Sequence, residues 1–200
     1  MGSISWPDSY GVNLGDNLTI SLPKITCPDT GLTIYGFDPV GKNKWNKAAA
    51  EALCKKINYA GLDNSFDTIL VPASKPFEMA MWLTDLLGHS SYVPLRKEKK
   101  LYMVNPQSVT IESAYDGRSR TFCWGDGEVA QLKGKRVAVF EDVVSSGGTL
   151  DGVFAVAKAI GFEVVFIACV LTEGQQHTDF NGVQIISLDH IPFPGVLQKV

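Results

Sequence analysis

The sequence predicts an α/β protein built on a parallel sheet with helices on both faces. Three observations support this fold class: strands and helices alternate through the middle of the chain, the strands are apolar along their whole length, and glycine or proline marks the helix ends. A strand that is apolar throughout is buried on both faces, as parallel strands between two helical layers are. Ligands of such sheets bind beyond the carboxyl ends of the strands, so the functional residues are expected there.

Composition fits one domain covering residues 1–200. The chain is 45% hydrophobic with a net charge of −3, and its acidic and basic residues are interspersed. We therefore expect neither nucleic acid nor a membrane as its partner. No apolar segment approaches the roughly 20 residues of a membrane span, and the N-terminus lacks signal-peptide features. The four cysteines have no CxxC or metal spacing, which favours reduced thiols. These features predict a cytoplasmic protein.

The first half of the chain begins with two short predicted strands, within residues 17–35. An alanine-rich helix follows at residues 44–57, where Trp45, Ala49, Leu53 and Ile57 share one face. Residues 67–73 form a short β-branched run, which predicts a buried strand. A helix is expected at residues 76–87, because proline suits a first helical turn and Gly88 suits the end.

The second half continues the same alternation. The apolar face of residues 149–160 predicts a helix that ends at Gly161. Residues 101–125 alternate weakly and carry glycines, serines and threonines, which indicates a mobile hairpin or a long loop. The remaining predicted strands span residues 91–97, 136–142, 163–172 and 183–188.

One stretch, "VAVFEDVVSSGGTL" at residues 137–150, combines a buried strand, two adjacent acids and a glycine-rich turn before a helix. Glycines let backbone N–H groups face inward, and the helix adds its positive N-terminal dipole. Ser145, Ser146 and Thr149 add hydroxyl donors, so the turn suits a phosphate. Glu141 and Asp142 would repel a lone phosphate. They suit a ligand that also carries hydroxyl groups and a divalent cation, such as a sugar phosphate with a vicinal diol.

Two common phosphate motifs are excluded by the residues themselves. A Walker loop needs a lysine after its last glycine, and none follows Gly148. The spacing G-x-G-x-x-G of dinucleotide-binding proteins is also missing. The stretch instead resembles the signature of the type I phosphoribosyltransferases, which bind 5-phosphoribosyl-1-pyrophosphate (PRPP). The resemblance covers about 13 residues of the motif and extends more loosely to other segments.

This resemblance implies roles for the motif residues. Glu141 and Asp142 would hold the ribose 2′- and 3′-hydroxyls and count among the catalytic residues. The 5′-phosphate would be bound by the turn that follows, formed by Val144, Ser145, Ser146, Gly147, Gly148 and Thr149. Mg²⁺ would be the cofactor, carried by PRPP, with Asp142 as the candidate residue to contact it.

The pyrophosphate of PRPP would be held by two loops. In "VPASKPFEMA" the resemblance aligns Ser74 and Lys75 with a family loop that often reads A-R-G or L-K-G. A non-proline cis peptide would fall between these two residues. Pro76 departs from the usual glycine and removes a backbone N–H, which puts turnover in question. "PLRKEKKLYM" resembles a basic loop of the adenine enzymes and adds Arg96, Lys97 and Lys100.

The nucleobase should lie near a mobile hairpin and a hood. "SVTIESAYDG" loosely resembles the adenine enzymes' mobile loop and places Glu112 as an acid/base. The hood would come from residues 1–40 and 172–200, around a core of about 41–171. Glu173 is the candidate for reading the base edge, and Phe193 or Phe180 for stacking on the ring. Nothing in these segments separates adenine from other purines.

The resemblance implies transfer of the 5-phosphoribosyl group from PRPP to a nucleobase, with a purine as the expected acceptor. The products would be a nucleoside monophosphate and pyrophosphate, as in nucleotide salvage, and the enzyme would be a homodimer. One alternative is a regulatory protein of the same fold that binds PRPP or a nucleotide without turnover. An orotate-type enzyme ranks lower, since those enzymes usually carry a longer N-terminal region and a different lysine loop.

Overall fold

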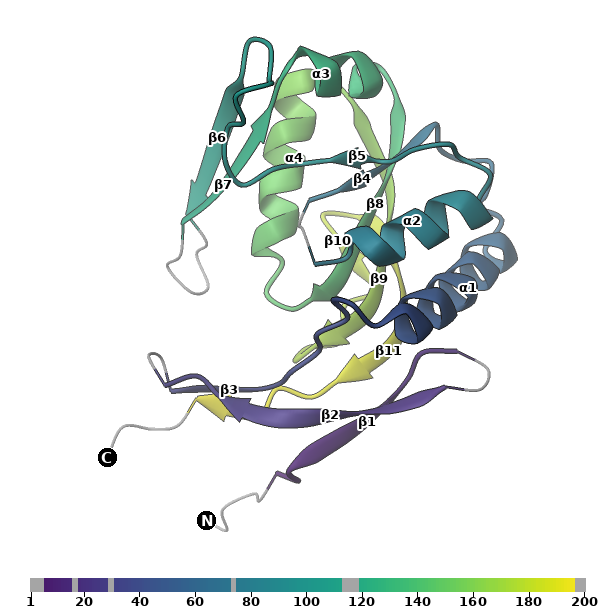
Figure 1. The fold of residues 1–200 in the computed structure, drawn as a ribbon, viewed down its shortest axis with the longest axis vertical. Coiled ribbons are helices and arrows are strands. Elements are labelled where there is room, and N and C mark those ends of the chain that lie inside the picture. Colours follow the sequence, from purple (N-terminus) through teal and green to yellow (C-terminus); the bar gives the residue numbers. More distant parts are fainter. Residues whose placement is uncertain (1–5, 16–17, 29–30, 73–74, 113–118, 197–200) are drawn as a thin grey trace.

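The computed structural model describes residues 6–15, 18–28, 31–72, 75–112 and 119–196. Its centre is a six-stranded sheet in the order β10-β11-β9-β8-β4-β5 (Figure 1). All neighbouring strands are parallel except β10 and β11, which are antiparallel. The strand bounds are β4 Thr68–Val71, β5 Val93–Pro94, β8 Arg136–Val144, β9 Glu163–Glu173, β10 Asp179–Phe180 and β11 Val183–Ile191. The predicted parallel α/β sheet is confirmed.

Helices cover both faces of this sheet, as the apolar strands predicted. α1 (Asn43–Tyr59) and α2 (Phe77–Leu86) pack on one face, and α4 (Gly148–Ile160) packs on the other (Figure 1). Alternate residues of β8 serve the two layers: Ala138 and Phe140 belong to the core beneath α1 and α2, and Val139 belongs to the core beneath α4. Successive side chains of a strand point to opposite faces, so a strand between two cores must be apolar at every position.

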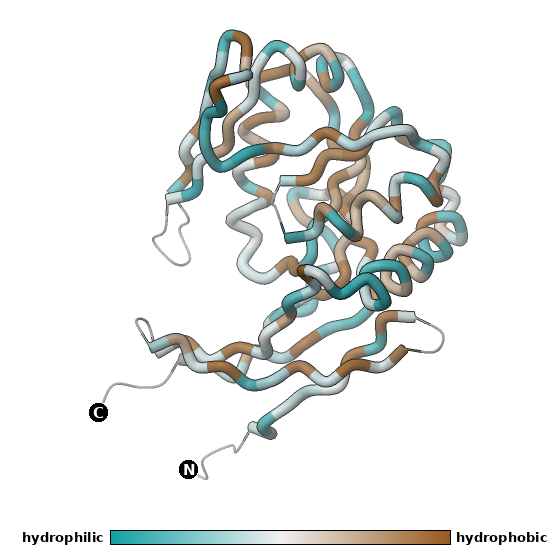
Figure 2. The backbone as a smooth tube through the Cα atoms, in the orientation of Figure 1, coloured by the Kyte–Doolittle hydropathy of each residue, from teal (hydrophilic) through white to brown (hydrophobic). Residues whose placement is uncertain are grey.

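A second, four-stranded sheet forms the hood. It has the order β1-β2-β3-β12, with β1 Ser9–Asn13, β2 Thr19–Thr26, β3 Leu32–Tyr35 and β12 Gly195–Val196, and all its pairs are antiparallel. Both ends of the chain therefore contribute strands to it, as expected. From Thr19 to Pro23, β2 alternates exposed and buried residues, and hydrophobic and more polar positions alternate along this strand in Figure 2. This pattern is typical of a sheet with one face in water.

Hydrogen bonds tie the hood to the core through the segment that precedes α1. The Asn46 side-chain amide donates to the Pro39 carbonyl at 3.0 Å and to Glu78 Oε2 at 2.8 Å, and the Gly41 amide donates to both Glu78 oxygens. Asn13 N also donates to Asp189 Oδ2 of β11 at 2.8 Å. Glu78 lies in the first turn of α2, so the start of that helix and the hood linker hold each other in place.

The predicted hairpin is present as β6 (Gln107–Glu112) and β7 (Ser119–Trp124), which pair antiparallel. It lies against α4, where a β-carbon on Gly152 would come within 1.9 Å of Phe122 Cε2. Glycine at position 152 therefore allows β7 to approach the helix. Its mobility stays a prediction. The elements that the sequence did not predict are β1, α3 (Asp126–Leu132), β10 and β12.

Candidate active site

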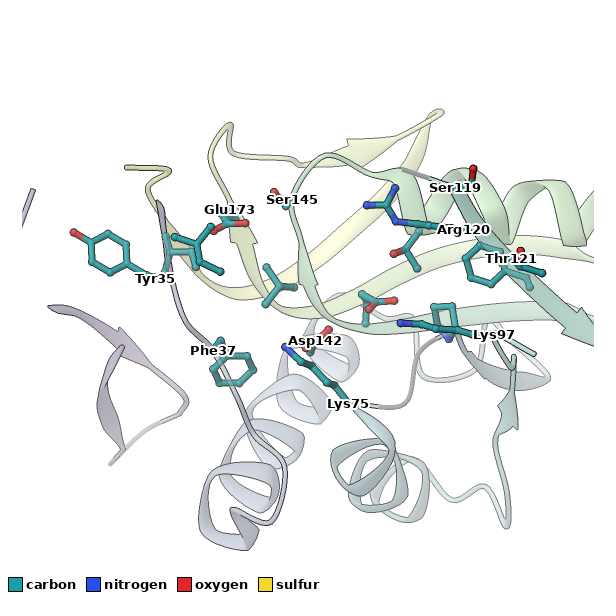
Figure 3. A pocket seen from close by; sticks show the side chains of 17 residues that line it. Tyr35, Phe37, Lys75, Lys97, Ser119, Arg120, Thr121, Asp142, Ser145 and Glu173 are labelled. Atoms are coloured by element: carbon teal, nitrogen blue, oxygen red, sulfur yellow. The ribbon is translucent and has the colours of Figure 1, made fainter. Parts of the chain in front are cut away.

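A cavity of about 760 Å³ opens at the carboxyl edge of the central sheet (Figure 3). Three groups of side chains share its wall. The hood and its linker supply Ile34, Tyr35 and Phe37, the strand ends supply Glu141, Asp142 and Glu173, and the cations are Lys75, Lys97 and Arg120. In Figure 3, Tyr35 and Phe37 lie on one side of the cavity, and Lys97 and Arg120 lie on the other. The cavity thus has an aromatic side and a basic side, with carboxylates between them.

The two adjacent acids of β8 are almost fully buried, with 5% of Glu141 and 7% of Asp142 exposed. Burial, and then the neighbouring Asp142 carboxylate, raise the pKa of Glu141 well above its ordinary value, while Lys97 and Lys75 oppose this shift. Glu141 Oε2 has no hydrogen-bond partner among the residues that the structure describes. A buried acceptor without a partner is costly. It is explained if a ligand hydroxyl or cation meets it when the site is filled.

The turn after β8 forms a second, smaller cavity of about 190 Å³. Its wall consists of residues 143–150, Glu141 and Arg120. Gly147 has φ +79°, a left-handed conformation that side chains with a β-carbon rarely adopt, and Gly148 begins α4. The turn, the N-terminus of α4 and Arg120 therefore border one small volume. Such a volume suits a phosphate.

Of the predicted pyrophosphate ligands, Lys75 and Lys97 line the main cavity and Arg96 and Lys100 do not. The guanidinium of Arg96 lies over the Tyr102 ring at 5.7 Å, and Lys100 forms an ion pair with Glu98. Ser74 and the proposed cis peptide before Lys75 lie outside the described residues. Pro76 precedes α2 directly, and its carbonyl accepts the Ala80 amide, so it starts the helix that follows Lys75.

The predicted base-binding residues do not all lie in the same cavity. Glu173 lines the main cavity at the end of β9, whereas Phe193 lines a neighbouring cavity that also borders Glu173 and Ser145. Phe180 packs against Gly147 and the Phe154 ring, so it supports the turn. Glu112 is exposed near the tip of the hairpin and does not line the main cavity. The roles proposed for these residues stay predictions.

Sequence reasoning missed Arg120, which borders both the main cavity and the phosphate-sized one. The available signal was the alternation of β7, where Arg120 and Phe122 are two residues apart and Phe122 is buried. An arginine two residues before a buried aromatic faces the same side as that aromatic. It also missed Tyr35 and Phe37, because hood residues gain a place at the site only through the tertiary fold.

Mg²⁺ must be considered because the sequence resemblance implies a substrate that carries a pyrophosphate group and this metal. Among the described residues, no group of three or more His, Cys, Asp or Glu side chains could hold a metal by itself. The orphaned Glu141 Oε2 and the neighbouring Asp142 still offer hard oxygen ligands of the type Mg²⁺ prefers. The residues therefore fit a metal that arrives on its substrate.

The site thus combines a buried acid pair at the end of a parallel strand with a glycine-rich turn at a helix N-terminus, the combination that the sequence resemblance implies for a phosphoribosyltransferase. The phosphoribosyl transferase domain family matches residues 40–194, and the chain belongs to that family. The chain is therefore a phosphoribosyltransferase, a glycosyltransferase, as the motif predicted.

Individual relatives are consistent with this assignment. The chain is 30% identical over 137 residues to the adenine phosphoribosyltransferase of Clostridium acetobutylicum, covering 68% of this chain and 74% of that protein. It is 29% identical to the Thermotoga petrophila adenine phosphoribosyltransferase over 142 residues, 70% of this chain and 78% of that one.

Solved structures share the fold. The adenine phosphoribosyltransferase of Thermoanaerobacter pseudethanolicus superposes with a TM-score of 0.62 at 24% identity, covering 84% of this chain and 95% of that one. The Saccharomyces cerevisiae enzyme, solved with a bisphosphate iminoaltritol and adenine, gives a TM-score of 0.65 at 19% identity, covering 84% of this chain and 93% of that one.

Within the part of the chain that the structure describes, no helix combines the length and apolar character needed to cross a membrane.

Proposed function

We propose that this protein transfers the 5-phosphoribosyl group of PRPP to a purine, with adenine as the first acceptor to test. The observation that carries the proposal is the buried pair Glu141 and Asp142, which lies between a phosphate-sized turn and a larger cavity with an aromatic side. The names of the curated relatives support adenine as the acceptor. The products would be AMP and pyrophosphate, as in purine salvage.

Each part of PRPP has a matching group in the site. The turn from Val144 to Thr149, with Arg120, would bind the 5′-phosphate. Glu141 and Asp142 would accept hydrogen bonds from the ribose hydroxyls. Lys75 and Lys97 would stabilise the pyrophosphate, since both cations line the main cavity with Glu141 and oppose the rise in its pKa. Arg96 and Lys100 would have to move to join them.

The chemistry asks for positioning and charge more than for covalent catalysis. Displacement at the anomeric carbon passes through a transition state with positive charge on the ribose, which the buried carboxylates would stabilise. Mg²⁺, when bound with PRPP, supplies charge neutralisation of the leaving pyrophosphate. Asp142 is the residue that would contact it. The cations at the basic side of the cavity would share that task.

The acceptor would lie on the hood side. Ile34, Tyr35 and Phe37 offer apolar and aromatic surface there, and Glu173 offers a carboxylate. A flat heteroaromatic ring with polar edges suits such a wall.

A homodimer is part of the proposal. Leu101, Tyr102 and Val104 expose large apolar surfaces beside the basic loop, and burying them against a second copy would cover this patch.

The test is pyrophosphate release from PRPP and Mg²⁺ with adenine, guanine, hypoxanthine, xanthine and orotate in turn. We expect turnover with a purine and none with orotate. PRPP binding measured by calorimetry, without turnover on any base, would contradict the enzyme and favour the regulatory alternative. In that case the next variant to test is Pro76→Gly, which restores the glycine that the family usually has at this position.

A further inference from the structure

Glu173 is the carboxylate nearest the hood side of the site that the chemistry above leaves without a task. It ends β9, the strand beside β8, and lines the main cavity together with Tyr35 and Ser145. Figure 3 shows it on the side of Tyr35, away from Lys97 and Arg120. The cations that would hold pyrophosphate are therefore not its partners, and its carboxylate faces the volume left for the base.

Ser145 is the neighbour of Glu173 in the site. Both residues line the main cavity and the neighbouring one, and hydrogen bonding from the Ser145 side chain is the influence that lowers the pKa of the Glu173 carboxyl. Ser145 belongs to the turn proposed for the 5′-phosphate, and it borders the main cavity, the phosphate-sized cavity and the neighbouring one. The serine thus joins the ribose side of the site to the base side. The Glu173 carboxylate therefore lies beside this turn, next to both the ribose side and the base side of the proposed site.

We propose that Glu173, oriented by Ser145, accepts the proton that the purine loses from its imidazole ring when it attacks the ribose. The proposal rests on the proposed function and assigns a proton acceptor to that reaction. The base nitrogen forms a bond to the anomeric carbon, and the bond from that carbon to pyrophosphate breaks, with its electron pair leaving on pyrophosphate. The ring N–H proton passes to the Glu173 carboxylate and then to water. Ser145 is a positioning residue in this scheme.

The surroundings of Glu173 suit this task. Partial burial raises the pKa of its carboxyl, and the Ser145 hydrogen bond moderates the rise. A carboxylate with a pKa nearer to neutrality takes up a proton more readily. The charged groups of the main cavity are Lys75, Lys97, Arg120, Glu141 and Asp142. His177 borders Glu173 from the neighbouring cavity, and His190 on β11 pairs with Thr172.

The rival for this role is Glu112, the hairpin carboxylate that the sequence suggested. It is exposed on β6 and absent from the wall of the main cavity. Glu173 needs no movement of the hairpin to reach the base, whereas Glu112 does. Comparing the two glutamine variants therefore separates a proton acceptor built into the sheet from one delivered by a moving hairpin.

The experiment measures pyrophosphate release by the full chain with PRPP, Mg²⁺ and adenine, for wild type, Glu173→Gln, Ser145→Ala and Glu112→Gln. The matched control is Glu163→Gln, the same change at the exposed first residue of the same strand. PRPP affinity by calorimetry and thermal unfolding are recorded for each. We expect Glu173→Gln to lower kcat about 100-fold, within the range usual for a general base. The PRPP affinity of Glu173→Gln should stay within about threefold of the wild-type affinity. The control Glu163→Gln should match wild type in both kcat and PRPP affinity.

The pH profile separates proton transfer from a structural effect. Wild-type kcat/KM should fall at low pH as Glu173 becomes protonated. This fall is the acid limb of the pH profile, and Glu173→Gln should lack it. Ser145→Ala removes the bond that holds the pKa of Glu173 down, so the limb should move to higher pH. The profile is repeated in His177→Asn, which removes the histidine that borders Glu173. A limb that disappears in His177→Asn but persists in Glu173→Gln would overturn the proposal.

Three other outcomes decide the matter. Glu173→Gln turnover within threefold of wild type, with an unchanged pH profile, would overturn the role of Glu173. A large loss in Glu112→Gln with none in Glu173→Gln would give the role to the hairpin. Wild-type protein that turns over no base would overturn the proposed function itself, and the proton acceptor with it.

Discussion

The ring of Phe180 lies directly against Gly147, so that a β-carbon at position 147 would come within 2.2 Å of the ring's Cε2. Gly147 also has φ +79°. The phosphate turn thus depends on glycine twice, for its backbone conformation and for the close approach of β10.

Gly147→Ala should therefore disrupt the turn. The left-handed backbone costs about 1–2 kcal/mol for alanine, and the clash with Phe180 adds to it. We expect a lower unfolding temperature and at least a tenfold loss of PRPP affinity by calorimetry. Gly161→Ala is the matched control, since Gly161 also has a positive φ but a β-carbon there would meet no described atom within 4 Å. Equal PRPP affinity in wild type and Gly147→Ala would refute the role of the turn.

The double variant Glu141→Gln with Asp142→Asn tests the ribose site. Losing hydrogen bonds to charged acceptors, each worth about 1.5–3 kcal/mol, should lower PRPP affinity at least 100-fold. The unfolding temperature should hold or rise, because the variant removes buried carboxylates, one of which has an oxygen without a partner among the described residues. Asp151→Asn, an exposed acid in the first turn of α4, is the control. Unchanged PRPP affinity in the double variant would count against ribose binding by this pair.

Arg120 should matter for PRPP and not for the base. It borders the phosphate turn and the main cavity from β7. Steady-state kinetics of Arg120→Ala should show a KM for PRPP raised about 10- to 100-fold, as expected for a charge-assisted contact with phosphate. The KM for adenine should change little, and Lys133→Ala, an exposed cation after α3, should behave as wild type. A rise in the KM for adenine alone would contradict a contact between Arg120 and the phosphate of PRPP.

Asp67 should give the fold a pH-dependent contribution. Its carboxylate accepts hydrogen bonds from Arg136 N at 2.8 Å and from Arg136 Nη2 at 3.1 Å, joining the starts of β4 and β8. These bonds lower the pKa of Asp67 below its ordinary 3.8. The unfolded chain then binds this proton more readily than the folded chain, so the stabilisation is complete above pH 3.8 and disappears as pH falls through the lowered pKa.

The variant Asp67→Asn should accordingly unfold at a lower temperature than wild type at pH 7, and the difference should shrink towards pH 3. Thermal unfolding monitored by circular dichroism measures both. Asp63→Asn, in the turn before β4, serves as the control because Asp63 accepts a hydrogen bond from its neighbour Asn64 and so joins no distant elements. A difference that stays constant down to pH 3 would contradict the ionic origin of this contribution.

Local sequence patterns predicted most of the central fold because its longer strands carry the apolar pattern on their own. β8 is apolar at every position from Val137 to Phe140, and α4 shows its buried face in Leu150, Val153 and Ile160. The hood strand β1 was missed because only one of its five residues, Val12, is buried, and the short strand β12 was missed because it is stabilised by pairing with β3, distant in sequence. Such pairing leaves little local signal.

The same distinction holds for the site. The acid pair and the turn occupy consecutive positions, so the sequence alone located them. Tyr35, Phe37 and Arg120 reach the cavity from elements far apart in the chain, and only the fold brings them together. Arg96 and Lys100 have the expected residue type, but their side chains contact Tyr102 and Glu98 instead of the cavity.

The most direct test of phosphoribosyl transfer follows the ribose carbon. Protein is mixed with Mg²⁺, adenine and PRPP labelled with ¹³C in the ribose, and the products are identified by mass spectrometry. We predict labelled AMP and pyrophosphate in equal amounts. Labelled PRPP recovered intact, or labelled ribose 5-phosphate with no labelled nucleotide for any base of the panel, would contradict transfer to a nucleobase.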